Sequence, residues 1–210
     1  MKNGLVEYPD GSKHWYLNGQ LHREDGPAAE NVDGHKEWYL SDQLHREDGP
    51  AIEFPNGTKK WYLNGQHHRE DGPAVERADG NKEWWKNGQP HREDGHAVER
   101  SDGTKEWRQN GQRHREDGPA IEYSDGTKAW WINNLSHRLD GPAVEYPNGE
   151  KGWFLKGEKL IPLIAGTLIS SKTGDKPSPG DLVKDEINNL RLITAVVGDA
   201  DQGYHLAFLK

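Results

Sequence analysis

Residues 45–67 read HREDGPAIEFPNGTKKWYLNGQH, and close copies of this stretch fill about three-quarters of the 210-residue chain. The copies follow one another at a fixed spacing of 23 residues, and seven tryptophans mark the period: Trp15, Trp38, Trp61, Trp84, Trp107, Trp130 and Trp153. A fixed period without slippage is typical of one small structural unit copied end to end. In such an array each unit contacts mainly its neighbours, so the surface is a ladder of equivalent positions.

Other residues recur in the same register. A His-Arg pair begins at His22, His45, His68, His91, His114 and His137, and Asp-Gly, proline and alanine follow, with His96 replacing one proline. The shared unit therefore contains the motif His-Arg-x-Asp-Gly-Pro-Ala. Residues 1–21 form a copy that lacks this first part.

Each copy contains two segments of strand-forming residues, for example 51–54 and 59–63. Asn56-Gly57 separates these two segments, and Asn64-Gly65 follows the second one. Such pairs are the strongest short-range signal for a tight hairpin turn, and the frequent proline and glycine exclude helices of ordinary length. We predict an all-β fold: an elongated single-sheet array of about seven antiparallel β-hairpin repeats over residues 1–157.

Strand alternation assigns the faces of this array. Trp61 and Leu63 share one face, and Tyr62 points to the other. We predict that the seven in-register tryptophans form the structural core of the repeats, because each indole can bury a large area. The rings on the opposite face are either half-covered by neighbouring turns or exposed as a strip for a partner: Tyr16, Tyr39, Tyr62, Trp85, Trp131 and Phe154.

Residues 158–210 differ from the repeats. Apolar runs at 182–183, 190–197 and 204–209 predict three strands. The segment Pro179-Gly180-Asp181-Leu182-Val183 resembles the entry to a small SH3-like barrel. We predict a C-terminal cap or small β domain that shields the open end of the sheet. Whether this domain also binds a partner stays open.

The composition narrows the class of function. Hydrophobic residues make up 31% of the chain, charged residues make up 30%, and the net charge is −8. This acidity argues against binding of nucleic acid or anionic membranes by charge. The chain has no cysteine, and we see neither a secretory signal nor an apolar run long enough to span a membrane. We therefore expect a cytoplasmic protein.

The recurring histidines suggest neither a metal site nor an active site. Equivalent residues in stacked hairpins lie about 10 Å apart, which is too far for two of them to share one metal ion. Translation also repeats like residues along a line, whereas an active site needs unlike residues at one point. We expect no enzyme activity, no metal and no cofactor. The arginines are expected to pair with carboxylates of their own repeat, as Arg23 would with Asp25 or Glu30.

The consensus lapses most in two adjacent repeats, where function would override the pattern. The position after the first strand varies along the chain: Tyr8, Asn31, Phe54, Arg77, Arg100, Tyr123 and Tyr146. We predict a partner-binding patch at the non-consensus residues: Arg77, Trp84, Trp85, Lys86, His96, Arg100, Arg108, Gln109 and Arg113. Sequence drift in a tolerant array explains these lapses equally well.

The 23-residue unit resembles the MORN-repeat family, and in particular its variant with the His-Arg-x-Asp-Gly-Pro-Ala signature. The resemblance covers residues 1–157 and implies a twisted sheet of hairpins that acts as a scaffold without catalytic residues. Such variants are common in bacteriophage and bacterial genomes, which implies a phage-encoded factor that binds and inhibits a host defence protein. The alternative is a small-molecule binder that sequesters a nucleotide through stacked rings and arginines. The oligomeric state stays open.

Overall fold

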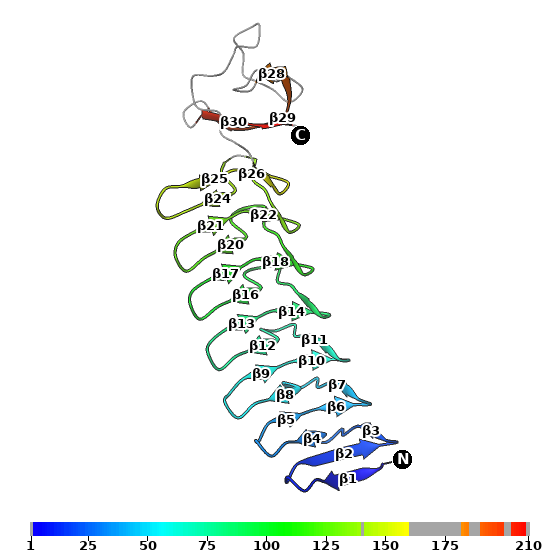
Figure 1. Cartoon of the computed structure of the whole chain (residues 1–210). Coiled ribbons are helices and arrows are strands. Elements are labelled where there is room, and N and C mark those ends of the chain that lie inside the picture. Colours follow the sequence, from blue (N-terminus) through cyan, green and yellow to red (C-terminus); the bar gives the residue numbers. More distant parts are fainter. Residues whose placement is uncertain (1, 140, 160–181, 185–189, 200–202, 209–210) are drawn as a thin grey trace. The chain divides into compact units, whose positions relative to one another are not determined.

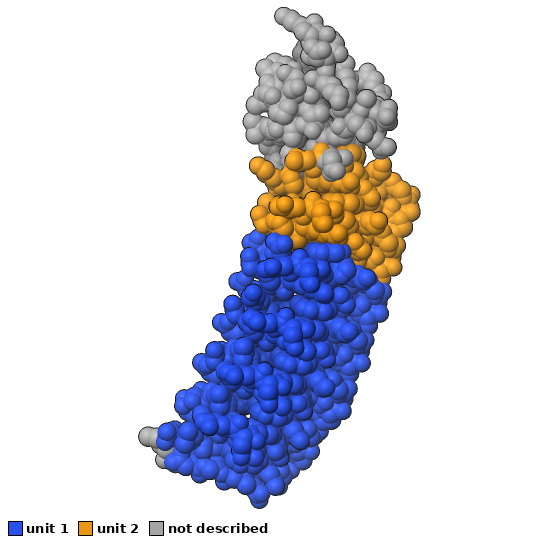
Figure 2. Space-filling view, turned by 180° about the vertical axis from the view of Figure 1, so that it is seen from behind, with its two compact units in different colours: residues 1–112 blue, residues 113–210 orange. Residues whose placement is uncertain are grey.

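In a computed structural model of the chain, the described residues are 2–139, 141–159, 182–184, 190–199 and 203–208. They contain no helix, so the all-β prediction is confirmed, and none of them forms a helix able to cross a membrane. The chain divides into unit 1, residues 1–112, and unit 2, residues 113–210 (Figure 2). The predicted domain boundary after residue 157 stays a prediction.

Unit 1 is built around one antiparallel sheet in which the strands pair in sequence order, hairpin after hairpin (Figure 1). β3 (Gln20–Leu21) pairs with β2 beside this series. The strands of the series are β1 (Gly4–Glu7), β2 (Lys13–Leu17), β4 (Ala29–Glu30), β5 (Lys36–Glu37), β8 (Ile52–Glu53), β9 (Lys59–Lys60), β12 (Val75–Glu76), β13 (Lys82–Glu83), β16 (Val98–Glu99) and β17 (Lys105–Glu106).

A second, smaller hairpin follows each long one. In unit 1 these two-stranded ribbons are β6 (Tyr39–Leu40) with β7 (Gln43–Leu44), β10 (Tyr62–Leu63) with β11 (Gln66–His67), and β14 (Trp85–Lys86) with β15 (Gln89–Pro90). β18 (Arg108–Gln109) also lies in unit 1, and β19 (Gln112–Arg113) contains the boundary between the units. The predicted single sheet of antiparallel hairpins is confirmed, and the row of two-stranded ribbons beside it was not predicted.

The tryptophan is the residue at which the pairing changes. The predicted strand 59–63 is interrupted at Trp61, which belongs to neither β9 nor β10. Its backbone N–H donates to the Ala74 carbonyl at 2.8 Å, and its own carbonyl accepts from the His68 N–H at 3.2 Å. Before Trp61 the chain pairs with neighbouring strands of the sheet, and after it the chain pairs with its own return segment. Only β2, which includes Trp15, continues through this point.

The two turns of each repeat have different geometries. In the second turn both central residues have positive φ, as Asn64 (49°) and Gly65 (76°) show, which is the two-residue turn that asparagine and glycine favour. In the first turn only the glycine does: the Gly57 N–H donates to the Phe54 carbonyl at 3.0 Å, and Gly57 has φ 90°. This is a type I turn followed by a glycine bulge.

The fully buried core consists of small side chains. The alanine two residues after the Asp-Gly pair is 0% exposed in each of six copies: Ala28, Ala51, Ala74, Ala97, Ala120 and Ala143. The β-branched residues Ile52, Val75 and Ile121 are buried beside them. Six of the seven in-register tryptophans are half-buried, and Trp153 is 7% exposed. The indoles thus border a core of alanine, valine and isoleucine.

The recurring histidine joins the start of its copy to the second turn of the same copy. Nδ1 of His45 accepts a hydrogen bond from the backbone N–H of Asn64, nineteen residues later, at 3.2 Å. The same contact links His22 to Ser41, His68 to Asn87 and His91 to Asn110 in unit 1. Oδ1 of Asn64 also lies 3.0 Å from Nδ1 of His45. These histidines hold the second turn of the copy that they begin.

Unit 2 continues the same elements. Its sheet strands are β20 (Ile121–Glu122), β21 (Lys128–Ala129), β24 (Val144–Glu145) and β25 (Lys151–Gly152), and its ribbons are β22 (Trp131–Ile132) with β23 (Leu135–Ser136) and β26 (Phe154–Leu155) with β27 (Glu158–Lys159). A three-stranded sheet of β28 (Leu182–Lys184), β29 (Leu190–Asp199) and β30 (Gly203–Phe208) follows. The three predicted C-terminal strands are present, whereas Pro179-Gly180 lies outside the described residues.

Candidate functional site

Unit 1 has two faces of different character. We call constant face the side that carries the recurring tryptophan, arginine and aspartate of each repeat, such as Trp61, Arg69 and Asp71. We call variable face the side that carries three non-recurring positions per repeat, such as Phe54, Lys60 and Tyr62. Lys60 and Tyr62 flank Trp61 in the chain, so alternation directs their side chains away from the indole.

On the constant face, each arginine lies over the tryptophan eight residues earlier in the chain, which belongs to the preceding copy. The guanidinium carbon of Arg69 lies 4.1 Å from the centroid of the Trp61 ring, within the range of a cation–π contact. The equivalent distances are 4.1 Å for Arg23 on Trp15, 4.2 Å for Arg46 on Trp38 and 4.3 Å for Arg92 on Trp84. Because these rings are already covered on one side, the constant face is largely paired within itself.

The same arginines also bind carboxylates. Nε of Arg69 donates to Asp71 at 2.8 Å, and its Nη1 donates to Glu76 at 2.9 Å. The arginine of a repeat can therefore engage both carboxylates that the sequence offered as alternatives. The hydrogen bond from Arg69, and then its charge, hold the pKa of Asp71 below its ordinary value, so this exposed carboxylate is ionised at neutral pH.

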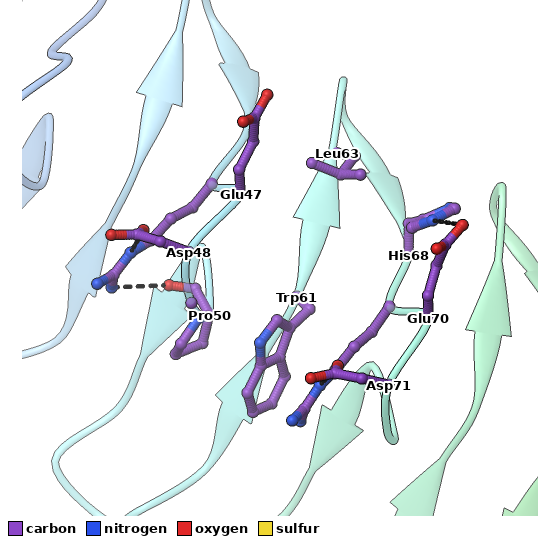
Figure 3. A pocket seen from close by; sticks show the side chains of 11 residues that line it. Glu47, Asp48, Pro50, Trp61, Leu63, His68, Glu70 and Asp71 are labelled. Atoms are coloured by element: carbon purple, nitrogen blue, oxygen red, sulfur yellow. Dashed lines mark hydrogen bonds and ion pairs between the residues drawn. The ribbon is translucent and has the colours of Figure 1, made fainter.

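A pocket of about 570 Å³ opens on the constant face between two consecutive loops (Figure 3). One wall contains Asp48 and Pro50, the other contains Glu70 and Asp71, and Trp61 lies between them. All of its lining residues stand at recurring positions of the repeat. The pocket is therefore a product of the repeat geometry, and it was not among the predicted sites.

On the variable face, the three non-recurring positions form rows along unit 1. The first row is Tyr8, Asn31, Phe54, Arg77 and Arg100; the second is His14, Glu37, Lys60, Glu83 and Glu106; the third is Tyr16, Tyr39, Tyr62, Trp85 and Arg108. Neighbouring rows interact, as Tyr39 of the third row and Glu37 of the second row show. Burial raises the pKa of Tyr39 to about 12, and the charge of Glu37 and a hydrogen bond with Glu37 contribute to this rise.

Part of the predicted patch comes together around Glu83. Nη2 of Arg77 donates to Oε1 of Glu83 at 3.0 Å, and Nε1 of Trp85 donates to Oε2 of the same carboxylate at 3.0 Å. Glu83 was not among the predicted site residues. It satisfies both the charge of Arg77 and the polar end of the Trp85 indole.

The following copy has a similar arrangement around the buried carboxylate of Glu106. Glu106 is only 3% exposed, and it accepts from Nη2 of Arg100 at 3.1 Å and from Nη2 of Arg108 at 2.8 Å. Sequence reasoning missed Glu106 as well. A partial signal was present: both repeats with an arginine in the first row, Arg77 and Arg100, carry glutamate in the second, although Glu37 stands there beside Asn31.

The other predicted patch residues do not join this cluster. Trp84 lies under Arg92 on the constant face, and Lys86 and Gln109 are exposed at the position that Leu63 holds in its repeat. The centroids of the His96 and Trp107 rings lie 3.6 Å apart. Arg113 belongs to unit 2, where its guanidinium carbon lies 5.3 Å from the Trp131 ring centroid.

His67 is a further variable-face residue that the sequence did not single out. It stands opposite Tyr62 in the β10–β11 ribbon, and its Nε2 lies 2.9 Å from the Tyr62 hydroxyl oxygen. Its ring centroid lies 5.1 Å from that of Trp85, and its Nδ1 is buried without a hydrogen-bond partner in the structure. Burial lowers the pKa of His67. Leucine holds this position in the two preceding repeats, at Leu21 and Leu44.

The part of the chain that the structure describes contains no group of three or more His, Asp or Glu side chains that could hold a metal ion. The chain matches no protein-family model, and no curated protein matches it. Its candidate function therefore depends on the two faces of the repeats.

Proposed function

We propose that the protein is a non-enzymatic protein-binding module that contacts its partner through the variable face of unit 1. One observation carries this proposal. The constant face repeats the same internal pairings in each copy, whereas the differences between repeats fall mainly on the other face. Repeat proteins of this kind share a scaffold and use the non-recurring surface positions for recognition.

The residues on the variable face suit a protein contact. Tyrosine, tryptophan and arginine are enriched at the centres of interfaces, and Tyr39, Tyr62 and Trp85 are half-buried, so part of each ring remains accessible. Five equivalent positions spaced about 10 Å apart extend over about 40 Å. A face of that length can provide the roughly 800 Å² per partner that a stable complex requires.

The resemblance found in the sequence extends the proposal to a phage-encoded factor that binds and inhibits a host defence protein. The second candidate, nucleotide binding, needs arginines that can engage a phosphate. Arg77, Arg100 and Arg108 instead contact carboxylates at 3.0, 3.1 and 2.8 Å. A phosphate would have to compete with these carboxylates, which favours the protein partner.

The test replaces part of the variable face without removing its packing. Arg100→Tyr, Glu106→Ala and Arg108→Trp together install the set that Tyr123, Ala129 and Trp131 form in unit 2. We expect wild-type protein to capture a partner from host lysate and this triple variant to lose it. The matched control changes the constant face by Arg92→Lys and should retain the partner.

Two outcomes would contradict the proposal. One is capture of the same partners by wild type and triple variant in equal amounts. The other is thermal stabilisation of the wild type by one nucleotide in a panel, abolished in the triple variant, which would establish the small-molecule alternative.

A further inference from the structure

Consecutive loops of the constant face form notches. A notch is the space between the His-Arg-Glu-Asp-Gly-Pro loops of two successive repeats, with the intervening tryptophan at its base. The second notch lies between loops 45–50 and 68–73 and is the pocket of about 570 Å³ (Figure 3). We call first notch the equivalent place one copy earlier, where loops 22–27 and 45–50 flank the recurring positions of Trp38 and Leu40.

The base of the second notch is apolar. Trp61, Leu63 and Pro50 line it. The Arg69 guanidinium covers one side of the indole at 4.1 Å, and in Figure 3 the ring lies between Pro50 and Asp71. An aliphatic stem entering the notch would pack against Pro50, Leu63 and the indole.

The rim of the notch is acidic. Four carboxylates line it against two guanidiniums, and both arginines already hold an aspartate, Asp48 or Asp71, at 2.8 Å. Glu47 and Glu70 reach no arginine in the described contacts. Each lies 3.7–3.8 Å from a histidine Nε2, and their side chains are 85% and 80% exposed. The excess negative charge is therefore carried by Glu47 and Glu70 at the mouth of the notch, where it can attract a cationic group.

The spacing of the notches restricts the shape of a ligand. Each repeat advances the sheet by two strands, or about 9.4–9.8 Å. A polyproline II segment advances about 9.3 Å in three residues and returns every third side chain to the same side. A β-strand has period 2, so residues three apart point to opposite sides. Only the first geometry places side chains in consecutive notches.

We infer that the first and second notches bind an extended basic segment of another protein, with lysine or arginine at positions i and i+3 in a polyproline II conformation. The stem of each basic side chain lies on the tryptophan, leucine and proline of its notch. The head group lies between the glutamates at the mouth. This site is on the constant face, apart from the surface of the proposed function.

The sequence at the third notch explains why the row of binding places ends after the second notch in unit 1. It lies between loops 68–73 and 91–96 with Trp84 at its base, but Lys86 stands where Leu40 and Leu63 stand in the other two. A lysine there repels an incoming cation. His96 also replaces the proline of the second loop. The non-consensus Lys86, assigned by sequence to a binding patch, thus ends the basic-segment site.

The experiment uses the full chain and fluorescently labelled proline-rich peptides, with binding followed by anisotropy. One peptide has two arginines three residues apart, and a second has the same composition with the arginines adjacent. We expect the spaced peptide to bind about tenfold more tightly. Equal affinities for the two peptides, or no binding of either, would overturn the inference.

Two variants with the same change in charge test the location. Glu24→Gln, Glu47→Gln and Glu70→Gln together should weaken binding of the spaced peptide about tenfold, because each removes one charge at a mouth. Asp10→Asn, Asp33→Asn and Asp79→Asn should change it less than about twofold. These aspartates lie in the first turns, where Asn56 occurs naturally. Equal losses in both variants would show general attraction to an acidic protein and would refute the site.

A gain of binding completes the test, since misfolding cannot imitate it. Lys86→Leu supplies the leucine that the third notch lacks. It should raise the affinity for a peptide with three arginines at three-residue spacing about fivefold, and change that for the two-arginine peptide less than about twofold. No gain for the longer peptide would contradict the role given to the leucine. All of these changes leave the variable face intact, so their failure would not bear on the proposed function.

Discussion

The guanidinium carbon of Arg69 lies 4.1 Å from the centroid of the Trp61 ring, and the same contact recurs in successive repeats of unit 1. The arginine comes eight residues after the tryptophan in the chain. It thereby covers an indole that a core of small residues leaves half-exposed. Arginine suits this place because its planar group stacks on a ring while its N–H groups reach Asp71 and Glu76.

We predict that Arg69→Lys lowers the free energy of unfolding by about 1–2 kcal/mol, although the charge is kept. Lysine cannot stack flat on the indole and bond two carboxylates together. Urea unfolding measures the effect. The control is Arg77→Lys, at an exposed position on the variable face, which should cost less than about 0.5 kcal/mol. Equal costs at both positions would show that stacking on Trp61 contributes nothing.

The glycine of the His-Arg-Glu-Asp-Gly-Pro loop leaves the space that the arginine side chain occupies. A Cβ built on Gly72 would lie 2.9 Å from the guanidinium carbon of Arg69. We therefore predict that Gly72→Ala displaces Arg69 from Trp61 and destabilises the protein by about 1 kcal/mol. In the Arg69→Ala background the same change should cost almost nothing, because the group it displaces is gone. Additive losses in this double-mutant cycle would disprove the steric explanation.

Much of the fold could be predicted because the decisive signals are local. The period of 23 and the Asn-Gly pairs, such as Asn64-Gly65, specify hairpins, and the all-β array of repeats is confirmed. The break at Trp61 could not be predicted, because a strand-like run does not show which neighbour each residue bonds. The alternation of side chains along residues 59–63 does not indicate that the backbone hydrogen bonds pass from one neighbouring strand to another at Trp61.

The candidate site was only partly predictable, for a related reason. The lapses at Arg77, Arg100 and Arg108 were visible in the sequence, but their shared partners depend on which residues the hairpin brings together. Glu83 and Glu106 lie six residues after the first two arginines, across a turn with a glycine bulge. Comparing columns between repeats shows only that both repeats with such an arginine also carry a glutamate, because Glu37 accompanies Asn31 in another repeat. The notches depend on loop packing, which no pattern of residues in one repeat reveals.

We predict that His67 makes the stability of the protein depend on pH near neutrality. Burial is the main cause of the lowered pKa of His67, and the charges of Lys60 and Arg77 add to it, while the Trp61 backbone and the charge of Glu83 oppose it. The unfolded chain then binds a proton more readily than the folded one. The free energy of unfolding should fall as the pH drops below the ordinary value of 6.5 toward the lowered pKa.

Replacing this residue with leucine tests the linkage, since Leu21 and Leu44 hold the position in other repeats. His67→Leu should lose less stability than wild type between about pH 7.5 and about pH 5.5, as measured by urea unfolding at each pH. His35→Thr removes a different histidine and leaves His67 in place, so its loss should be at least as steep as that of wild type. An unchanged pH dependence in His67→Leu would show that His67 is not the group responsible.

The last prediction concerns the buried carboxylate of Glu106. It is 3% exposed and holds both Arg100 and Arg108, so Glu106→Ala leaves two guanidiniums without that partner. We expect a loss of about 2 kcal/mol, less than for a fully buried pair because Arg100 is exposed. Alanine itself is compatible with this position, since Ala129 is buried there between Tyr123 and Trp131 on the same face. The triple variant Arg100→Tyr, Glu106→Ala and Arg108→Trp should therefore recover most of the lost stability in urea unfolding. If it unfolds as readily as Glu106→Ala alone, the arginines are not the cause of the loss, and the rows of the variable face do not vary as matched sets.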